Sequence, residues 1–323
     1  MNKKNKPIIV ISKCLGFEAC RYNGQNLPQP FVEKLKNHVS FLPICPEVEI
    51  GLGIPRDPIR IIGNNEKRYL YQPATELDIT DKMNIFIRNF ISELGRVDGF
   101  ILKNRSPSCG IGDVKIYESK KKDAKSIRGN GFFGNKVLQK YTDCAVEDEG
   151  RLNNNLIREH YLIKLYTMSK FRQLSHELNQ LIQFHSVNKL LFMAYNQSVM
   201  RKIGKILANH DNNNLTSVFL NYKEGLILML RKPAKTSAYI NILQHALGGF
   251  KNQLEKLEKA FFLNLLEEYR DERIPLSVPV AVLKSWAIKY QNNYILNQTF
   301  TEPFPKELIN IEAYKNRRDY NFI

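Results

Sequence analysis

The sequence lacks the patterns that mark membrane spans, export signals and the common zinc sites. No window approaches the ~18 consecutive apolar residues that a membrane-spanning helix needs, and the short apolar run 7–12 is too brief for the core of a signal peptide. The five cysteines include no CxxC pair, and there is no HExxH motif. An odd number of cysteines without an export signal argues against a disulfide framework. We therefore expect a cytoplasmic protein with reduced thiols and no membrane segment.

Negative charge is also scarce. The 323 residues contain 48 Lys and Arg against 32 Asp and Glu, a formal net charge of +16. Residues 1–150 hold 24 basic and 18 acidic side chains, and the remainder holds 24 and 14. Such an excess favours a polyanionic partner, most commonly nucleic acid. A composition that is simply rich in Lys and Asn is the alternative explanation.

The first part of the chain alternates between strand and helix patterns. Runs of β-branched and apolar residues predict strands at 7–12, 40–47, 98–104 and 113–117. Apolar residues at helical spacing predict helices at 31–39 and 78–94. This alternation is typical of an α/β domain with a Rossmann-like parallel sheet, which we assign to residues 1–154. The charged, glycine-containing stretch 118–133 is expected to be a flexible surface loop.

Long helical periodicity dominates from about residue 155 onward, and strand-like alternation is scarce. We therefore expect residues 155–323 to form an all-α domain.

Three cysteines follow predicted strands, with Cys14 after the first, Cys45 at the end of the second and Cys109 after the third. Because the carboxyl ends of parallel strands lie at one edge of a sheet, the three thiols can meet there. Soft thiolates suit iron–sulfur chemistry better than magnesium or calcium. Three ligands would leave one iron of a [4Fe-4S] cluster open. The alternative is that the cysteines are small buried hydrophobic residues.

Three segments carry a family resemblance: SKCLGFEACRYNG (12–24), PICPEVEIGLGIPR (43–56) and KNRSPSCG (103–110). They resemble the signature motifs of the thiouracil desulfidase family in order, spacing and flanking residues. The resemblance implies a [4Fe-4S] cluster held by Cys14, Cys45 and Cys109, whose fourth iron takes the sulfur of the substrate. Neither Cys20 nor Cys144 is assigned as a ligand, and Cys144 is expected in the core. A cluster also implies a partnership with the iron–sulfur assembly machinery.

The second half resembles the bacterial YbgA-type domain. The matching segments are LFMAYN (191–196), RKIGK (201–205), NILQHALGGFK (241–251), IPLSVP (274–279) and YILNQTFTEPFPKEL (294–308). A fusion of these two domains resembles the tRNA 4-thiouridine desulfidases, in which the helical domain is thought to help hold tRNA. This implies RNA contacts in the second half, for which Arg201 and Lys202 are candidates.

The implied reaction is a hydrolysis without redox change, in which water replaces the sulfur of a thiolated uracil. Glu47, two residues after Cys45, is our candidate for the general base, although it could merely cap the following turn. Either Ser106 or Ser108 could bind the substrate or move a proton, or both could serve only the local turn. The candidates for phosphate or base contacts are Arg21, Arg56, Lys103 and Arg105, each of which could also be an ordinary surface charge.

Three functions stay open at this point. The first is desulfuration of 4-thiouridine in tRNA, the second is desulfuration of free thiouracil or thiolated nucleosides and nucleotides, and the third is RNA binding without catalysis around a structural cluster.

Two further patterns are given less weight. The GxGxxG match at 129–134 does not follow the first strand, so a dinucleotide site is not expected. We expect His245 to be a core histidine rather than an RNA contact.

Overall fold

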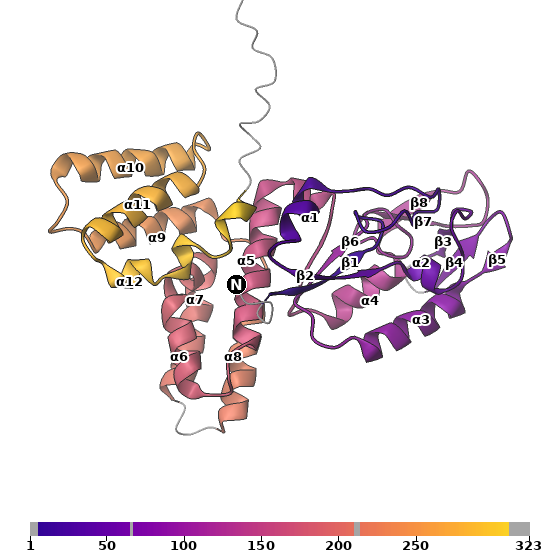
Figure 1. Ribbon diagram of the computed structural model, residues 1–323, viewed down its shortest axis with the longest axis horizontal. Helices are drawn as coiled ribbons and strands as arrows, with labels where there is room; N and C mark the ends of the chain where they lie inside the picture. The colour runs from indigo at the N-terminus through magenta and orange to yellow at the C-terminus, as the bar shows by residue number, and fades with distance from the viewer. Residues whose placement is uncertain (1–5, 65–66, 210–213, 310–323) are drawn as a thin grey trace, which may run out of the picture. The chain divides into compact units, whose positions relative to one another are not determined.

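The computed structural model describes residues 6–64, 67–209 and 214–309, which form two compact units (Figure 1). The first unit holds the described residues up to Ser169 and those from Pro305 onward, and the second is Lys170–Phe304. Helix α5 (Asn155–Arg172) thus lies mostly in the first unit, whereas the sequence placed the division before this helix. None of the described helices is long and apolar enough to cross a membrane.

The first unit is built on a four-stranded parallel sheet, sheet A, with the order β2-β1-β6-β9. Its strands are β1 (Ile8–Ser12), β2 (Ser40–Ile44), β6 (Gly99–Leu102) and β9 (Ala145–Asp148). The central strands β1 and β6 are almost entirely buried, as expected of a parallel sheet that is covered on both faces. This confirms the predicted α/β fold with a parallel sheet.

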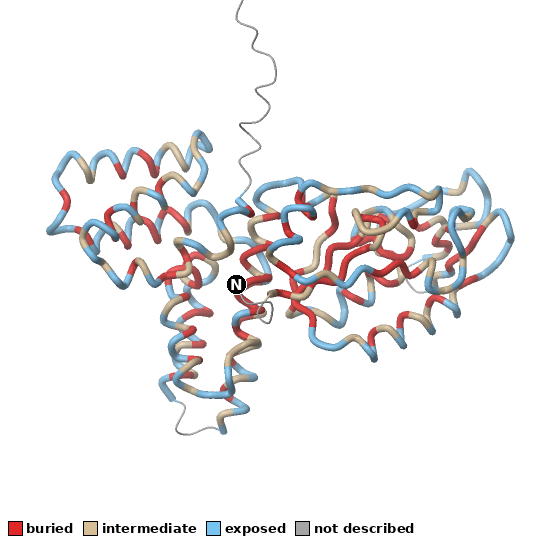
Figure 2. Tube along the Cα trace, in the orientation of Figure 1, coloured by how far each residue is buried: buried red, intermediate tan, exposed pale blue. Residues whose placement is uncertain are grey.

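Helices α1 (Pro30–Leu35), α3 (Thr80–Glu93) and α4 (Phe132–Lys140) connect these strands. Helix α3 buries Met83, Ile87 and Ile91, which lie four residues apart and so share one face. That face joins a single core with α4 and with the strands of sheet A. In Figure 2 the buried residues concentrate on these strands and on the inner sides of the helices. Full burial of each large apolar side chain stabilises the fold by roughly 2 kcal/mol.

A second sheet, sheet B, is a feature that the sequence patterns did not predict. Its order is β5-β4-β3-β7-β8, and only the β3–β7 pair is parallel. Its strands are β3 (Arg60–Gly63), β4 (Arg68–Gln72), β5 (Leu77–Asp78), β7 (Val114–Tyr117) and β8 (Ser126–Gly129). Its apolar residues belong to the same core as those of sheet A.

Two expectations are corrected by sheet B. The strand predicted at 113–117 exists as β7, but it belongs to sheet B, and β9 is the fourth strand of sheet A. The stretch 118–133 is not one flexible loop, because β8 pairs with β7 and α4 begins at Phe132. Short strands with exposed, charged residues on one side have little periodicity, and the pattern therefore concealed them.

The second unit is helical, as predicted. It contains α6 (Leu178–Val187), α7 (Lys189–Ala208), α8 (Leu215–Met229), α9 (Thr236–Gly248), α10 (Lys256–Arg270), α11 (Ser277–Lys289) and α12 (Asn293–Leu296). Tyr222, Tyr239 and Phe250 lie in its core. Short 3-10 segments complete the described chain at Arg151–Asn153, Thr299–Thr301 and Lys306–Leu308.

Candidate functional site

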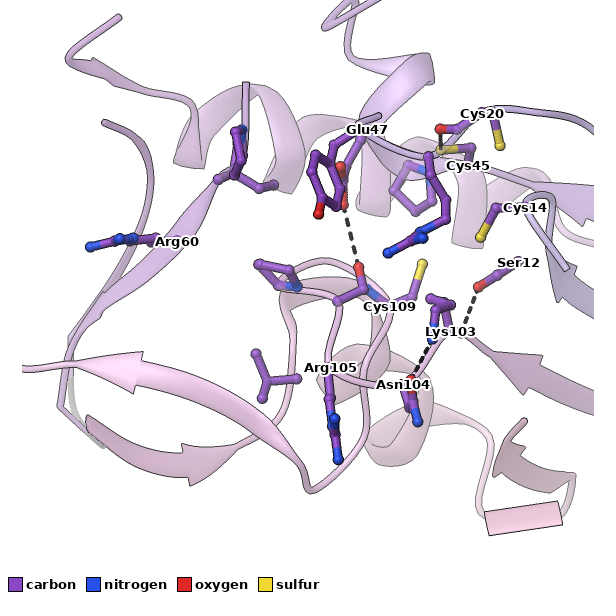
Figure 3. Close-up of a pocket in the computed structure, with 18 of the residues that line it drawn as sticks. Ser12, Cys14, Cys20, Cys45, Glu47, Arg60, Lys103, Asn104, Arg105 and Cys109 are labelled. Atoms are coloured by element: carbon purple, nitrogen blue, oxygen red, sulfur yellow. Dashed lines mark hydrogen bonds between the residues drawn. The ribbon is translucent and has the colours of Figure 1, made fainter. Parts of the chain in front are cut away.

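Three cysteines from loops at the carboxyl ends of sheet A line one cavity. Cys14 follows β1, Cys45 follows β2 directly, and Cys109 lies in the loop between β6 and β7. The cavity has a volume of about 760 Å³, and residues of β3, β7 and β8 line its other side. Figure 3 shows the sulfur atoms of Cys14 and Cys109 pointing into it. The fold therefore brings together the three residues that the sequence singled out.

All three thiols are nearly inaccessible, with 8%, 9% and 5% of Cys14, Cys45 and Cys109 exposed. Burial is the main cause that raises the pKa of Cys109 above its usual range. The pKa of Cys45 is raised as well, mainly by a hydrogen bond with Cys20 and secondly by burial. The metal-free thiols of Cys45 and Cys109 are therefore protonated at neutral pH, and a metal must displace their protons as it binds.

A fourth cysteine, Cys20, also lines the cavity and is completely buried. Its thiol forms hydrogen bonds with Cys14 and Cys45, and the bond with Cys14 contributes most to raising its pKa to about 11. Cys20 lies within the first sequence motif, six residues after Cys14 in an irregular loop, but the sequence analysis did not assign it as a ligand. All of the described cysteines are free thiols.

The donor set of the cavity suits a cluster better than a single ion. No three His, Cys, Asp or Glu side chains in the described part of the chain are grouped closely enough to bind one metal ion. An iron–sulfur cluster distributes its thiolate ligands over separate iron atoms and so needs a wider spacing. Soft sulfur donors, a buried setting and a cavity at the centre of the three loops fit such a group.

Glu47 is the second residue of the short helix α2 (Pro46–Glu49), which begins directly after Cys45. Its Oε1 atom accepts hydrogen bonds from Ser108 Oγ at 3.0 Å and from Ser106 Oγ at 3.3 Å. These bonds hold the carboxylate at the cavity wall, and Figure 3 shows it above the loop that carries Cys109. Glu47 therefore contacts the loop that carries Cys109.

Arg56 holds the other oxygen of Glu47. Its Nε and Nη2 atoms lie 2.9 and 2.8 Å from Glu47 Oε2, and its Nη1 donates to the carbonyl oxygen of Cys20 at 3.0 Å. The Arg56 side chain is only 4% exposed. It lines the cavity and forms a buried ion pair, whereas the sequence had made it a candidate for a phosphate or base contact or for an ordinary surface charge.

The two serines differ in accessibility. Ser106 lines the cavity, whereas Ser108 is completely buried. Ser106 Oγ also accepts hydrogen bonds from the backbone N–H groups of Ser108 and Cys109, at 3.2 and 3.1 Å. Ser106 therefore stabilises the local turn and also faces the cavity. Its role in the turn is compatible with a role in substrate binding or proton transfer.

The remaining basic candidates of the first unit also line the cavity, and all have partners. Lys103 is mostly buried and pairs with Glu149. Arg105 is 73% exposed and pairs with Asp113 at 3.0 Å. Arg21 donates to the Gln25 side chain at 2.9 Å. Arg21 and Arg105 can therefore reach a ligand at the cavity mouth, whereas Lys103 holds the ends of β6 and β9 together.

The glycine-rich segment before α4 supports the Cys109 loop. The N–H groups of Gly131, Phe132 and Gly134 donate to carbonyl oxygens of Gly110, Pro107 and Ser108, at 2.8, 3.0 and 3.1 Å. A Cβ atom on Gly134 would lie 2.5 Å from the carbonyl oxygen of Cys109. Only glycine permits this approach. The GxGxxG match at 129–134 therefore marks close packing under Cys109.

The two RNA candidates of the second unit occupy different positions. Both are exposed on α7, but Arg201 lines a separate cavity of this unit and Lys202 does not. His245, expected in the core, is exposed and lines the same cavity as Arg201.

Comparisons with known proteins match each half of the chain. A family model described as 2-thiouracil desulfurase matches residues 9–149, and one described as a protein of unknown function (DUF1722) matches residues 189–305. Among solved structures, the [4Fe-4S]-dependent thiouracil desulfidase TudS is 28% identical, with a TM-score of 0.35 over 46% of this chain and 94% of that chain.

Two curated relatives show the same division. The uncharacterised protein YbgA of Escherichia coli (strain K12) is 28% identical over 97 residues, which is 30% of this chain and 57% of YbgA. The uncharacterised protein YbbK of Bacillus subtilis (strain 168) is 31% identical over 156 residues, which is 46% of this chain and 100% of YbbK. Because the match to YbbK spans that whole protein and the desulfurase model covers 9–149, the chain belongs to the 2-thiouracil desulfurase family.

Proposed function

We propose that the protein removes sulfur from 4-thiouridine in tRNA by a hydrolysis that depends on a [4Fe-4S] cluster, giving uridine and sulfide. The observation that carries this proposal is the single cavity that holds Cys14, Cys45, Cys109 and Glu47. Membership of the 2-thiouracil desulfurase family supports a thiolated uracil as the substrate. The five free thiols are consistent with a reducing cytoplasm as the place of reaction.

Cys14, Cys45 and Cys109 would hold the cluster through their thiolates. When bound, the cluster would supply an iron with an open coordination position, which acts as a Lewis acid on a thiocarbonyl sulfur. Arg56 Nη2 lies 3.9 Å from Cys45 Sγ, so it can donate a hydrogen bond to the sulfur of that ligand. Cys20 is not assigned as a ligand, although it lies beside Cys14 and Cys45.

Glu47 is the proposed general base. The reaction forms a bond between the oxygen of water and the ring carbon and breaks the carbon–sulfur bond, and the two protons of water are transferred to the released sulfide. Glu47 Oε1 faces the serine hydroxyl groups and can take a proton from water directly or through Ser106. Ser106 is assigned to this transfer because it lines the cavity, and the buried Ser108 is assigned to holding Glu47 in place.

A basic rim at the cavity mouth supports a polyanionic substrate. The rim is defined here as six charged residues that line the cavity and are exposed or half-buried, five of them basic and one acidic: Arg21, Arg60, Arg105, Lys115, Arg128 and Asp113. Asp113 is shared by Arg105 and Arg128, at 3.0 and 2.9 Å. Deeper in the cavity, Arg56 and Lys103 are instead neutralised by Glu47 and Glu149. The excess positive charge therefore lies where flanking phosphates of an RNA would pass.

The test compares substrates with anaerobically reconstituted protein. Loss of thiocarbonyl absorbance is followed with tRNA that contains 4-thiouridine, with the free nucleoside and with 2-thiouracil. We expect kcat/KM to be highest for tRNA and to fall steeply as salt rises, because phosphate contacts release counterions. Turnover of the free base alone would contradict the tRNA assignment. An intact cluster without turnover of any of the three would contradict the enzymatic proposal itself.

A further inference from the structure

The second unit contains a cavity of about 600 Å³ that none of the steps above uses. Its wall combines basic, sulfur-containing and aromatic side chains, and no acidic residue is among the described residues that line it: Lys189, Met193, Met200, Arg201, His245 and Tyr294. Its volume lies within the range of pockets that bind small molecules. An anion with an apolar, planar part would complement this wall.

Helix α7 folds back on itself to form the cavity. Asn196 has an extended conformation inside α7, with φ −162° and ψ 98°, and its Oδ1 accepts a hydrogen bond from the N–H of Val199 at 3.0 Å, so a new helical segment begins there. A Cβ atom on Gly204 would lie 3.3 Å from His185 Nε2. His185 lies near the end of α6, and Gly204 lies near the end of α7. The second segment of α7 therefore returns to the end of α6.

The two cations of the cavity are close to the same point. Lys189 follows His185 by four residues, and Arg201 precedes Gly204 by three. Arg201 therefore starts about one helical turn from Gly204 on α7. Lys189 is the first residue of α7, directly after the turn at Asn188 that ends α6, and it lines the cavity together with His185 and Gly204. Neither cation forms an ion pair with an acidic residue in the described ranges, whereas Lys284 of the same unit pairs with Glu302 at 2.8 Å. The unpaired charges favour an anionic ligand.

The remaining wall provides a surface for a flat ring. Tyr294 is 47% exposed although it lines a cavity, and Met200 is only 6% exposed. Aromatic and thioether side chains both make favourable contacts with π-systems. The ring of His185 is oriented by a hydrogen bond of 2.9 Å between its Nδ1 atom and the hydroxyl of the buried Tyr222. Its Nε2 atom is thereby directed toward Gly204 at the cavity wall.

We propose that this cavity binds a nucleotide unit, with the base against Tyr294 and the methionines and the phosphate between Lys189 and Arg201. The unit can be a base splayed out from an RNA chain or a free nucleoside monophosphate, since both present the same chemistry. The site lies within the second unit and is independent of the cysteine cavity.

The first experiment measures binding to the full-length protein. Fluorescence anisotropy follows a labelled single-stranded oligoribonucleotide, with UMP, uridine and inorganic phosphate as competitors. We expect Lys189→Gln to weaken binding about tenfold, because one charge-assisted contact is lost. Lys256→Gln is the matched control, since Lys256 is exposed on α10 of the same unit and lies outside the cavity. It should change binding less than twofold.

The second variant is Gly204→Ala. The added methyl group would press on His185 from inside the cavity wall, and alanine also favours the helix at this position. We expect weaker nucleotide binding together with an unfolding midpoint that does not fall. Loss of binding in this variant could therefore not be ascribed to an unfolded protein.

The competitors identify the ligand. Competition by UMP at lower concentrations than phosphate supports a site that contacts both base and phosphate. If UMP binds but the oligonucleotide does not, the ligand is a free nucleotide. If only the oligonucleotide binds, with the same dependence on Lys189, the unit belongs to RNA. Equal binding by Lys189→Gln, Gly204→Ala and Lys256→Gln would overturn the proposal, as would phosphate competing as well as UMP. Turnover of 2-thiouracil by the same variants is expected to be unchanged. A failure of the nucleotide site can thereby be distinguished from a failure of the proposed desulfuration.

Discussion

Arg56 and Glu47 form a buried ion pair beside Cys45, with Arg56 Nη2 2.8 Å from Glu47 Oε2. The two side chains are 4% and 13% exposed, so removing either one leaves a charge in a poorly solvated position. The pair holds Oε2, and the serine hydroxyls hold Oε1. The carboxylate is therefore fixed at the cavity wall by partners from two different loops.

Replacement of Glu47 by Gln tests the proposed base. The amide keeps the size of the side chain but cannot accept a proton from water, so we expect kcat to fall by about 10²- to 10⁴-fold. Iron content and the visible absorption of the reconstituted protein should stay at the level of the unmodified protein. A variant with full cluster and a rate within twofold of the original would show that Glu47 is not the base.

The serines are distinguished by parallel alanine variants. Because Ser106 lines the cavity and Ser108 is buried, Ser106→Ala should lower kcat by about tenfold or more. Ser108→Ala should chiefly lower the free energy of unfolding, by about 1–2 kcal/mol, since it removes one buried hydrogen bond to Glu47. Turnover assays and urea denaturation measure the two effects. A larger catalytic loss in Ser108→Ala would reverse the assignment.

The sequence predicted the meeting point of the cysteines because the relevant physics is simple. Buried parallel strands read as apolar runs, and the residues that follow such strands share one edge of the sheet. Cys14 and Cys109 follow the buried strands β1 and β6, and Cys45 follows the more exposed edge strand β2. The helical character of the second half was equally predictable, because long helices have a strong periodicity.

Other parts of the site depend on contacts that no local pattern records. Arg56 and Cys20 lie in irregular loops, and their positions are determined by bonds to Glu47, Cys14 and Cys45. The strands of sheet B are short and partly exposed, so their pattern resembles a charged loop. The basic rim that sheet B contributes, including Arg60 and Lys115, was therefore missed.

Gly134→Ala tests the support of the Cys109 loop. The new Cβ would lie 2.5 Å from the carbonyl oxygens of Cys109 and Gly110, so the loop must move. We expect a loss of about 1–3 kcal/mol of unfolding free energy and faster loss of iron after reconstitution. Gly95→Ala is the control, because nothing lies within 4 Å of its added Cβ. Equal iron retention in both variants would contradict the role of this packing.

His160 provides a pH-dependent prediction. Burial, with a smaller contribution from Lys164, lowers the pKa of His160 from 6.5 to about 4. The folded protein disfavours the charged ring, so stability is retained above pH 6.5 and lost as the pH falls toward 4. Protonation of His160 lowers the free energy of unfolding by at most about 3 kcal/mol. Urea denaturation should show a weaker acid dependence for His160→Gln; an identical dependence in both proteins would contradict this environment.

The ligand assignment makes a direct comparison of cysteine variants possible. Cys14→Ser, Cys45→Ser and Cys109→Ser each remove a proposed ligand, whereas Cys20→Ser changes a buried cysteine of the same cavity that is not assigned as one. The most direct measurement is the iron and acid-labile sulfide content of the four variants after anaerobic reconstitution. We predict about four irons per chain for Cys20→Ser, as expected of one [4Fe-4S] cluster, and a lost or rapidly decaying cluster for the other three. A stable, fully occupied cluster in any of those three would contradict the central claim.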